Sequence, residues 1–152
     1  EAYFGGDTRR INHARRVTEY TEEISRREGG DYPIIVGAGV LHDIGIHEAE
    51  RKYGSSAGKY QEIEGPPIAR EILTRYNLDT ETIEHICKII ANHHSAKDID
   101  TTEFWIVRDA DWLVNIPEDF PDADKEKLQR IIDKTFKTNK GREIAVESFL
   151  SK

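Results

Sequence analysis

The chain has 152 residues, of which 37% are hydrophobic and 34% are charged, so it is long enough to bury the core of one ordinary domain. Its formal charge of −7 disfavours nonspecific binding to nucleic acid, which depends on neutralising phosphates with Lys and Arg. No apolar run approaches the roughly 20 residues that a membrane-spanning helix needs. The single cysteine, Cys87, and the polar first residues, which do not resemble a signal peptide, lead us to expect a cytoplasmic protein with one domain over residues 1–152.

Apolar residues recur at helical rather than strand spacing along most of the chain, which predicts an all-α fold. The first helix is expected over Thr8–Glu28, where a Gly-Gly pair ends it. A second begins near Pro33 and ends at Gly45, and residues 47–60, rich in Gly, Ser and charge, are expected to form a loop. The remaining helices are expected near Pro66–Tyr76, Asp79–His94, Thr101 or Thr102 to the residue before Pro117, Asp122–Phe136 and Arg142–Leu150.

The strongest local signal for chemistry is the pattern LHDIG, Leu41 to Gly45, at the end of the apolar second helix. An adjacent His-Asp pair is weak evidence alone, because two polar residues at a helix end can simply face water. Here the apolar run places His42 and Asp43 at the end of a buried helix. Burying a carboxylate without a partner is very costly, so a metal ion or another cation is expected beside Asp43.

Two further ionisable residues lie on apolar helical stripes. His13 shares a face with Val17, although an inward His is more often a hydrogen-bonded core residue than a ligand. Asp111 shares a face with Val107, and a buried carboxylate charge must be paired. With the His-Asp pair they form a set of two His and two Asp, which suits Mn, Fe, Ni, Co, Zn or Mg rather than a thiolate-type site.

Three weaker candidates lie between these residues. His93 and His94 close the fourth expected helix, and one of them must face the core. The outward one is equally explained as a His that interacts with the C-terminal end of the helix dipole. Glu64 lies just ahead of the third expected helix, where it is either a ligand or an acidic residue that stabilises the first turn.

The order of these residues resembles the HD superfamily. The matching pieces are NHARRV with His13, LHDIG with His42 and Asp43, and RDADWL with Asp111. The resemblance implies a compact HD-domain bundle of about seven helices around a central metal site. It also implies that these four residues bind a divalent ion.

Many HD proteins with a second metal ion add further His ligands. The His-His pair of that pattern is present as His93 and His94, whereas Glu64 stands where another His is expected. The resemblance therefore implies one or two ions, and the second would be bound by Asp43 as a bridge, by Glu64, and by either His93 or His94. The Gly-Tyr-Pro signature of cyclic di-GMP phosphodiesterases does not follow the His-His pair, so that activity is not expected.

HD enzymes mostly hydrolyse phosphoesters, often of nucleotides, so the resemblance implies a metal-dependent phosphohydrolase that acts on a small phosphorylated molecule through metal-activated water. Asp43 is then catalytic as well as a ligand, and Glu48 either orients the water or is an exposed loop residue. Phosphate contacts are expected from Arg16, Lys59 and Lys97, each of which also has an ordinary explanation as solvated surface charge.

Two other functions stay open at this point. A di-iron HD-type oxygenase would bind two irons and consume oxygen, although Glu64 in place of a His disfavours it. A non-catalytic HD-fold sensor or binding module would lack both metal and activity. Such proteins usually lose at least one metal ligand, whereas this chain keeps the full set, which disfavours this alternative.

Overall fold

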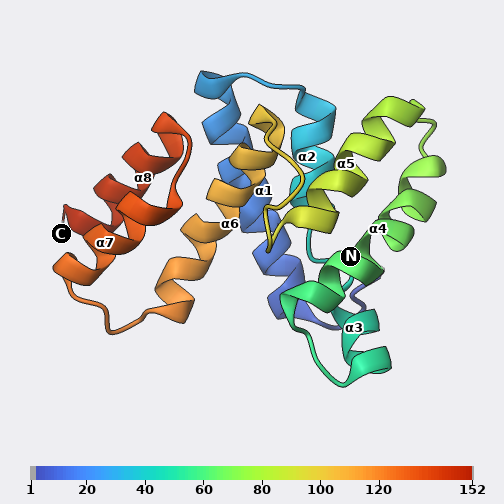
Figure 1. Cartoon of the computed structure of the whole chain (residues 1–152), viewed down its shortest axis with the longest axis horizontal. Helices are drawn as coiled ribbons and strands as arrows, with labels where there is room; N and C mark the ends of the chain where they lie inside the picture. Colours follow the sequence, from blue (N-terminus) through green and yellow to red (C-terminus); the bar gives the residue numbers. More distant parts are fainter. Residues whose placement is uncertain (1–2, 152) are drawn as a thin grey trace.

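The computed structural model describes residues 3–151, and in that range it contains α-helices and no β-strand. Among these residues, no helix is both long and apolar enough to span a bilayer. The predicted all-α fold is confirmed. The helices, labelled in Figure 1, are α1 (Thr8–Glu28), α2 (Tyr32–Leu41), α3 (Ile46–Tyr53), α4 (Gly58–Thr74), α5 (Thr80–Asn92), α6 (Thr102–Asp119), α7 (Lys125–Thr135) and α8 (Asn139–Leu150).

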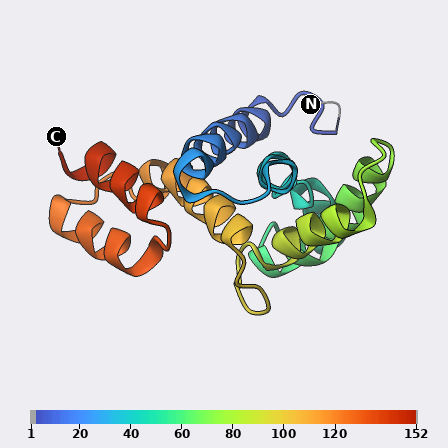
Figure 2. The same ribbon diagram turned by 90° about the horizontal axis from the view of Figure 1, so that it is seen from above.

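Helices α1, α2 and α6 form the centre of the molecule (Figures 1 and 2). Helix α5 packs on α2, α4 covers α5, and α3 packs on α4. On the opposite side, the α7–α8 hairpin packs through α8 against α6 and α1. One apolar cluster joins α2, α4, α5 and the start of α6, and a second joins α1, α6, α7 and α8. The central helices therefore contribute to both parts of the core.

Local capping explains why most of the helices begin where they do. In six helices of the described chain, the N-cap side chain accepts a hydrogen bond from a backbone N–H three residues later. Such caps satisfy N–H groups that have no partner inside the helix. The caps are Asp7, Asp31, Asp79, Thr101, Asp124 and Thr138.

The expected loop over residues 47–60 is wrong, because most of it is helical. Helix α3 starts directly after the His-Asp turn, buries Ile46 and Ala49, and ends at Gly54 in the left-handed conformation that favours glycine. Neither α3 nor α4 has a side-chain cap at its start. The sequence therefore carries no local signal for these two helix starts.

Helix α4 begins at Gly58 rather than at Pro66, and it continues through Pro66 and Pro67. Helix α6 likewise continues past Pro117 to Asp119. Interior proline removes a backbone hydrogen bond and normally breaks a helix. In α4, packing against α3 and α5 outweighs that preference, since the turn just before the prolines carries the buried residues Gln61, Glu64 and Gly65.

The buried carboxylate of Asp109 fastens the α7–α8 hairpin to α6. It accepts hydrogen bonds from the backbone N–H of Thr138 at 2.8 Å and of Lys137 at 3.2 Å, and from the Thr138 hydroxyl at 2.7 Å. Burial nevertheless raises the pKa of Asp109, although these bonds oppose the shift. A single buried acceptor group thus binds the two residues that lead into α8.

We expect Asp109→Ala to lower the free energy of unfolding by about 3 kcal/mol, because the buried donors are left without an acceptor. Urea unfolding followed by circular dichroism measures this loss. Asp133→Ala is the control, since Asp133 pairs with Arg142 at an exposed position and such pairs contribute less than about 1 kcal/mol. Equal losses in the two variants would contradict the role of Asp109.

Candidate metal centre

Four side chains from three helices meet where α1, α2 and α6 pack together. His13 extends from α1 and Asp111 from α6, while His42 and Asp43 lie in the turn that ends α2. His42 is 1% exposed and Asp43 is 9% exposed. His13 and Asp111 lie on helices that pack together, and α2 ends beside them, so helix packing itself brings the four groups together.

The donor atoms of these residues lie at the spacing of a metal coordination shell. Nε2 of His13 lies 3.2 Å from Nε2 of His42, 3.0 Å from Oδ1 of Asp111 and 3.1 Å from Oδ2 of Asp43. Nε2 of His42 lies 3.2 Å from the same oxygen of each carboxylate. Adjacent donors of an octahedral shell, each about 2.1 Å from the ion, lie roughly 3.0 Å apart. The residues therefore fit one divalent ion.

The orientation of His42 supports the same conclusion. Its Nδ1 lies 2.8 Å from the carbonyl oxygen of Gly39, so Nδ1 carries the hydrogen and donates it. In the neutral ring this leaves the lone pair on Nε2, which faces His13 and the two carboxylates. A backbone carbonyl that orients a ligating imidazole in this way is usual around protein-bound metals.

Protons and a metal ion compete for the four-residue group. Burial disfavours the charged ring of His13, but hydrogen bonds with Asp111 and Asp43 raise its pKa to about 9. His42 is buried more fully, yet the two carboxylates raise its pKa well above the usual value. Burial opposes ionisation of Asp43 and Asp111, but the His neighbours hold the pKa of each well below its usual range. A divalent ion that binds all four must displace the imidazole protons.

A second group of possible donors adjoins the first and shares Asp43 with it. The group comprises Asp43, His93 and His94. Nδ1 of His93 lies 2.7 Å from the carbonyl oxygen of Ile90 and donates to it, which leaves a lone pair on Nε2. That buried Nε2 lies 3.4 Å from Oδ1 of Asp43 and has no hydrogen-bond partner among the described residues. An atom of this kind indicates contact with a water, ion or substrate.

The structure does not bring Glu64 into either donor group. Its carboxylate accepts hydrogen bonds from Nζ of Lys52 at 2.7 Å and from the Tyr53 hydroxyl at 3.0 Å. The residue that meets the second group is Gln61, one helical turn earlier, whose Oε1 lies 3.1 Å from Nε2 of His94. The sequence interpretation missed Gln61 because a neutral amide is an uncommon ligand and because α4 was expected to start after it.

The expected substrate-contacting residues have different surroundings. Glu48 on α3 accepts a hydrogen bond from Nε of Arg51 at 3.0 Å and lies outside both donor groups. Nζ of Lys59 lies 4.9 Å from the centroid of the Tyr60 ring. Arg16 and Lys97 are exposed and make no side-chain hydrogen bond or ion pair with another described residue. Their roles remain predictions.

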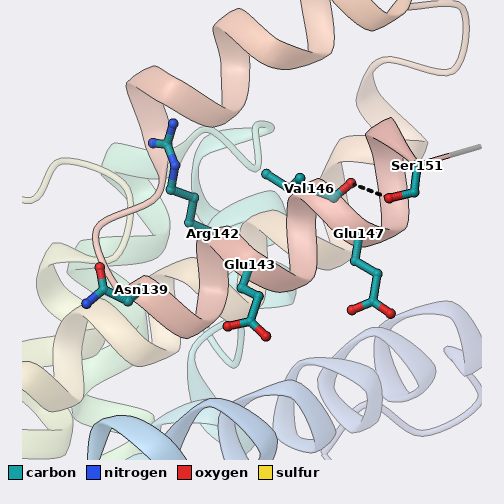
Figure 3. Close-up of a pocket in the computed structure, with 6 residues that line it drawn as sticks. All are labelled: Asn139, Arg142, Glu143, Val146, Glu147 and Ser151. Carbon is teal, nitrogen blue, oxygen red and sulfur yellow. Dashed lines mark hydrogen bonds between the residues drawn. The ribbon is translucent and has the colours of Figure 1, made fainter.

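A shallow hollow on the outer surface of α8 lies apart from both donor groups. Figure 3 shows its six lining side chains, all from α8 or the residue that follows it. Two of its three charged groups are already paired, since Arg142 bonds with Asp133 and Glu143 lies 2.7 Å from Arg27. The hollow therefore offers no converging set of free polar groups, unlike the interface of α1, α2 and α6.

Comparison with known proteins agrees with this geometry. The HD domain family model matches residues 10–116, a range that contains both donor groups. A crystal structure of a predicted HD superfamily hydrolase from an uncultured Thermotogales bacterium superposes with a TM-score of 0.69 at 25% identity, over 96% of this chain and 78% of that one. No curated protein matches the chain. The fold and the donor set are those of a metal-dependent hydrolase class. The chain belongs to the HD domain family.

Proposed function

We propose that this protein is a phosphohydrolase that cleaves a phosphoester or phosphoanhydride bond of a small metabolite such as a nucleotide. The observation that carries the proposal is the convergence of two imidazole nitrogens and two carboxylate oxygens at separations of 3.0–3.2 Å. Nitrogen and oxygen donors without a thiolate suit the hard and borderline divalent ions. These ions are widely used in phosphoryl chemistry.

A bound divalent ion supplies a water of lowered pKa and neutralises charge on a phosphoryl oxygen. The chain's own residues orient these components. Gly39 holds the ring of His42 through its carbonyl oxygen, while Oδ1 of Asp43 faces His93. Nε2 of His93 is free to accept a hydrogen bond from a water or a substrate hydroxyl beside Asp43. His93 is therefore proposed to position the attacking water or the substrate.

Neither donor group contains Cys, and we propose direct attack by water without a covalent enzyme intermediate. Cys87 is buried, its Sγ lies 3.6 Å from the carbonyl oxygen of Pro66, and burial raises its thiol pKa, which disfavours a thiolate nucleophile. A single turnover in oxygen-18 water should place the label on the phosphoryl product. A first turnover that carries only unlabelled oxygen would indicate a protein nucleophile.

Three cations are proposed to contact the substrate phosphate. Arg16 lies one turn after His13 on α1, and Lys97 follows His94 closely in the chain. Lys59 adjoins Gly58, whose backbone packs against the ring of His94. The acidic ligands and the formal charge of −7 repel an anionic substrate, so positive charge near the site is needed for binding.

The test is phosphate release from a panel of nucleotides and phosphomonoesters by protein loaded with Mn, Fe, Co, Ni, Zn or Mg. We expect at least one substrate to be hydrolysed, and we expect a chelator to abolish the activity and re-added metal to restore it. Metal-loaded protein that hydrolyses none of them would favour a binding module. Two irons per chain with oxygen consumption would instead indicate oxidative chemistry.

A further inference from the structure

Two cations gather on an indole ring beside the part of α6 that precedes Asp111. Cζ of Arg108 lies 5.8 Å and Nζ of Lys137 lies 5.6 Å from the centroid of the Trp105 ring. We propose that Arg108 and Lys137, held on Trp105, form a subsite for a second anionic group of the substrate, apart from the phosphoryl group that is cleaved. The inference deepens the proposed function and rests on it, because it makes the preferred substrate one with two anionic groups.

The Trp105 ring is fixed by its neighbours. Its Nε1 donates a hydrogen bond to Oδ1 of Asp100 at 2.6 Å, and Asp100 belongs to the segment that runs from the His-His pair to α6. The ring also lies edge-to-face with Phe104, at 4.9 Å between centroids, and packs on the apolar cluster of α2, α4, α5 and α6. Since the electron-rich face of an indole attracts positive charge, a fixed ring holds both cations near one place.

Neither cation has a carboxylate partner among the described residues. The side chains of Arg108 and Lys137 form no ion pair or hydrogen bond in that range, and their contacts are with the Trp105 ring. The adjacent Asp109 does not take this role, because its carboxylate accepts hydrogen bonds from the backbone of Lys137 and from Thr138. Two positive charges on one ring repel each other, and an anion that contacts both offsets this repulsion.

The position of Arg108 connects the cation pair with the four-donor site. Arg108 and Asp111 are three residues apart on α6, and side chains at this spacing lie on the same face of a helix with Cβ atoms about 5–6 Å apart. Lys137 approaches from the connection between α7 and α8, which Asp109 binds through the backbone N–H of Lys137. A substrate whose phosphoryl group lies at the bound ion can therefore reach Arg108 with a second anionic group.

The chemistry of the two side chains indicates a phosphate or carboxylate. A guanidinium presents a planar fork of N–H donors that matches two oxygens of such a group, and an ammonium adds a mobile point charge. Arg108 is half-buried and Lys137 is exposed, so the bound anion stays in contact with water and its affinity should fall as salt is added. A neutral group at the same place gains neither the charge nor the paired hydrogen bonds.

Calorimetric titration of inorganic pyrophosphate into the full chain, freed of metal and shown to be folded by circular dichroism, tests the cation pair without the metal centre. We expect saturable binding by the wild type and an affinity at least about 10-fold weaker in Arg108→Gln, because a charge-assisted hydrogen bond is lost. Lys137→Gln should also weaken binding. Lys134→Gln is the matched control, since Lys134 is an exposed cation on α7, and it should bind as the wild type does.

Trp105 itself supplies a local signal for the same titration. In Trp112→Phe, Trp105 is the single tryptophan that remains of the two in the chain. Pyrophosphate should change its emission, because the cations that lie over the ring then bind the anion. The change should disappear when Arg108→Gln and Lys137→Gln are added. Emission that does not respond while calorimetry shows binding would place the probe elsewhere and overturn the subsite.

The assignment to the substrate is tested with metal-loaded protein and two substrates that differ by one phosphate, a nucleoside monophosphate and the corresponding bisphosphate. Arg108→Gln should raise KM for the bisphosphate by at least about 10-fold while kcat stays near the wild-type value, because the lost contact stabilises substrate and transition state equally. KM for the monophosphate should change little. Lys134→Gln should leave both KM values unchanged.

The outcomes separate this inference from the proposed function. Absence of pyrophosphate binding, or equal binding by Arg108→Gln and Lys134→Gln, would overturn the subsite. Equal changes of KM for the two substrates would overturn its role in substrate selection. Pyrophosphate binding that depends on Arg108, in a protein that hydrolyses no phosphorylated compound with any metal, would support the subsite and contradict the proposed function.

Discussion

Asp43→Asn should weaken divalent-ion binding by more than roughly 100-fold and should reduce hydrolysis to background. Loss of a residue that only hydrogen-bonds to a metal ligand already weakens binding by up to about 100-fold, and Asp43 is proposed to be a ligand itself. Oδ2 of Asp43 lies 3.1 Å from His13 and 3.2 Å from His42, while Oδ1 faces His93. Asparagine keeps the shape of the side chain but removes the charge that balances the ion. Isothermal titration with Mn²⁺ measures the affinity, and phosphate release measures the activity.

Asp119→Asn is the matched control, because Asp119 is exposed at the end of α6 and lies outside both donor groups. This variant should bind Mn²⁺ as the wild type does. Retention of wild-type affinity by Asp43→Asn, in a protein with unchanged circular dichroism, would remove Asp43 from the ligand set.

Gly45→Ala should lower the free energy of unfolding by about 3 kcal/mol, the upper part of the usual range for overpacking. A Cβ at Gly45 would lie 2.6 Å from the backbone nitrogen of Gly65 and 2.9 Å from the carbonyl oxygen of Gln61. Both atoms are backbone, so α4 or the His-Asp turn must move as a whole. Since the turn carries His42 and Asp43, we also expect weaker binding of the ion.

Gly6→Ala provides the control, because a Cβ at Gly6 would meet nothing within 4 Å. Denaturant unfolding of the two metal-free variants should separate them by more than about 2 kcal/mol. Similar stability in both variants would mean that the turn and α4 can move apart at little cost in free energy.

Local signals account for the parts of the fold that could be predicted from the sequence. Helix α1 runs over Thr8–Glu28 as expected, because Asp7 caps its start and a Gly-Gly pair follows its end. Helix α3 and the first turns of α4 have no such signals, since neither helix has a capping side chain at its start. Their position follows from packing between segments, which a local pattern does not report.

The two donor groups also differ in how far the sequence predicts their contacts. The four residues of the first group could be proposed because each lies on, or directly ends, an apolar helical stripe, and helix packing brings such stripes together. The contact of Gln61 with His94 arises from the way α4 lies along α5. Gln61 is a neutral amide, and α4 was expected to start after it. The sequence therefore gave no chemical reason to expect that contact.

The four donors also bear on how long the protein persists in a cell. His13 and Asp111 are 98 positions apart in the chain, so an ion that binds both joins distant segments much as a long-range disulfide does. An ion present at 1,000 times its dissociation constant adds about 4.1 kcal/mol to the stability of a fold that binds it only when folded. A shortage of the metal would then expose more of the chain to proteolysis, and the abundance of the protein would follow the metal supply.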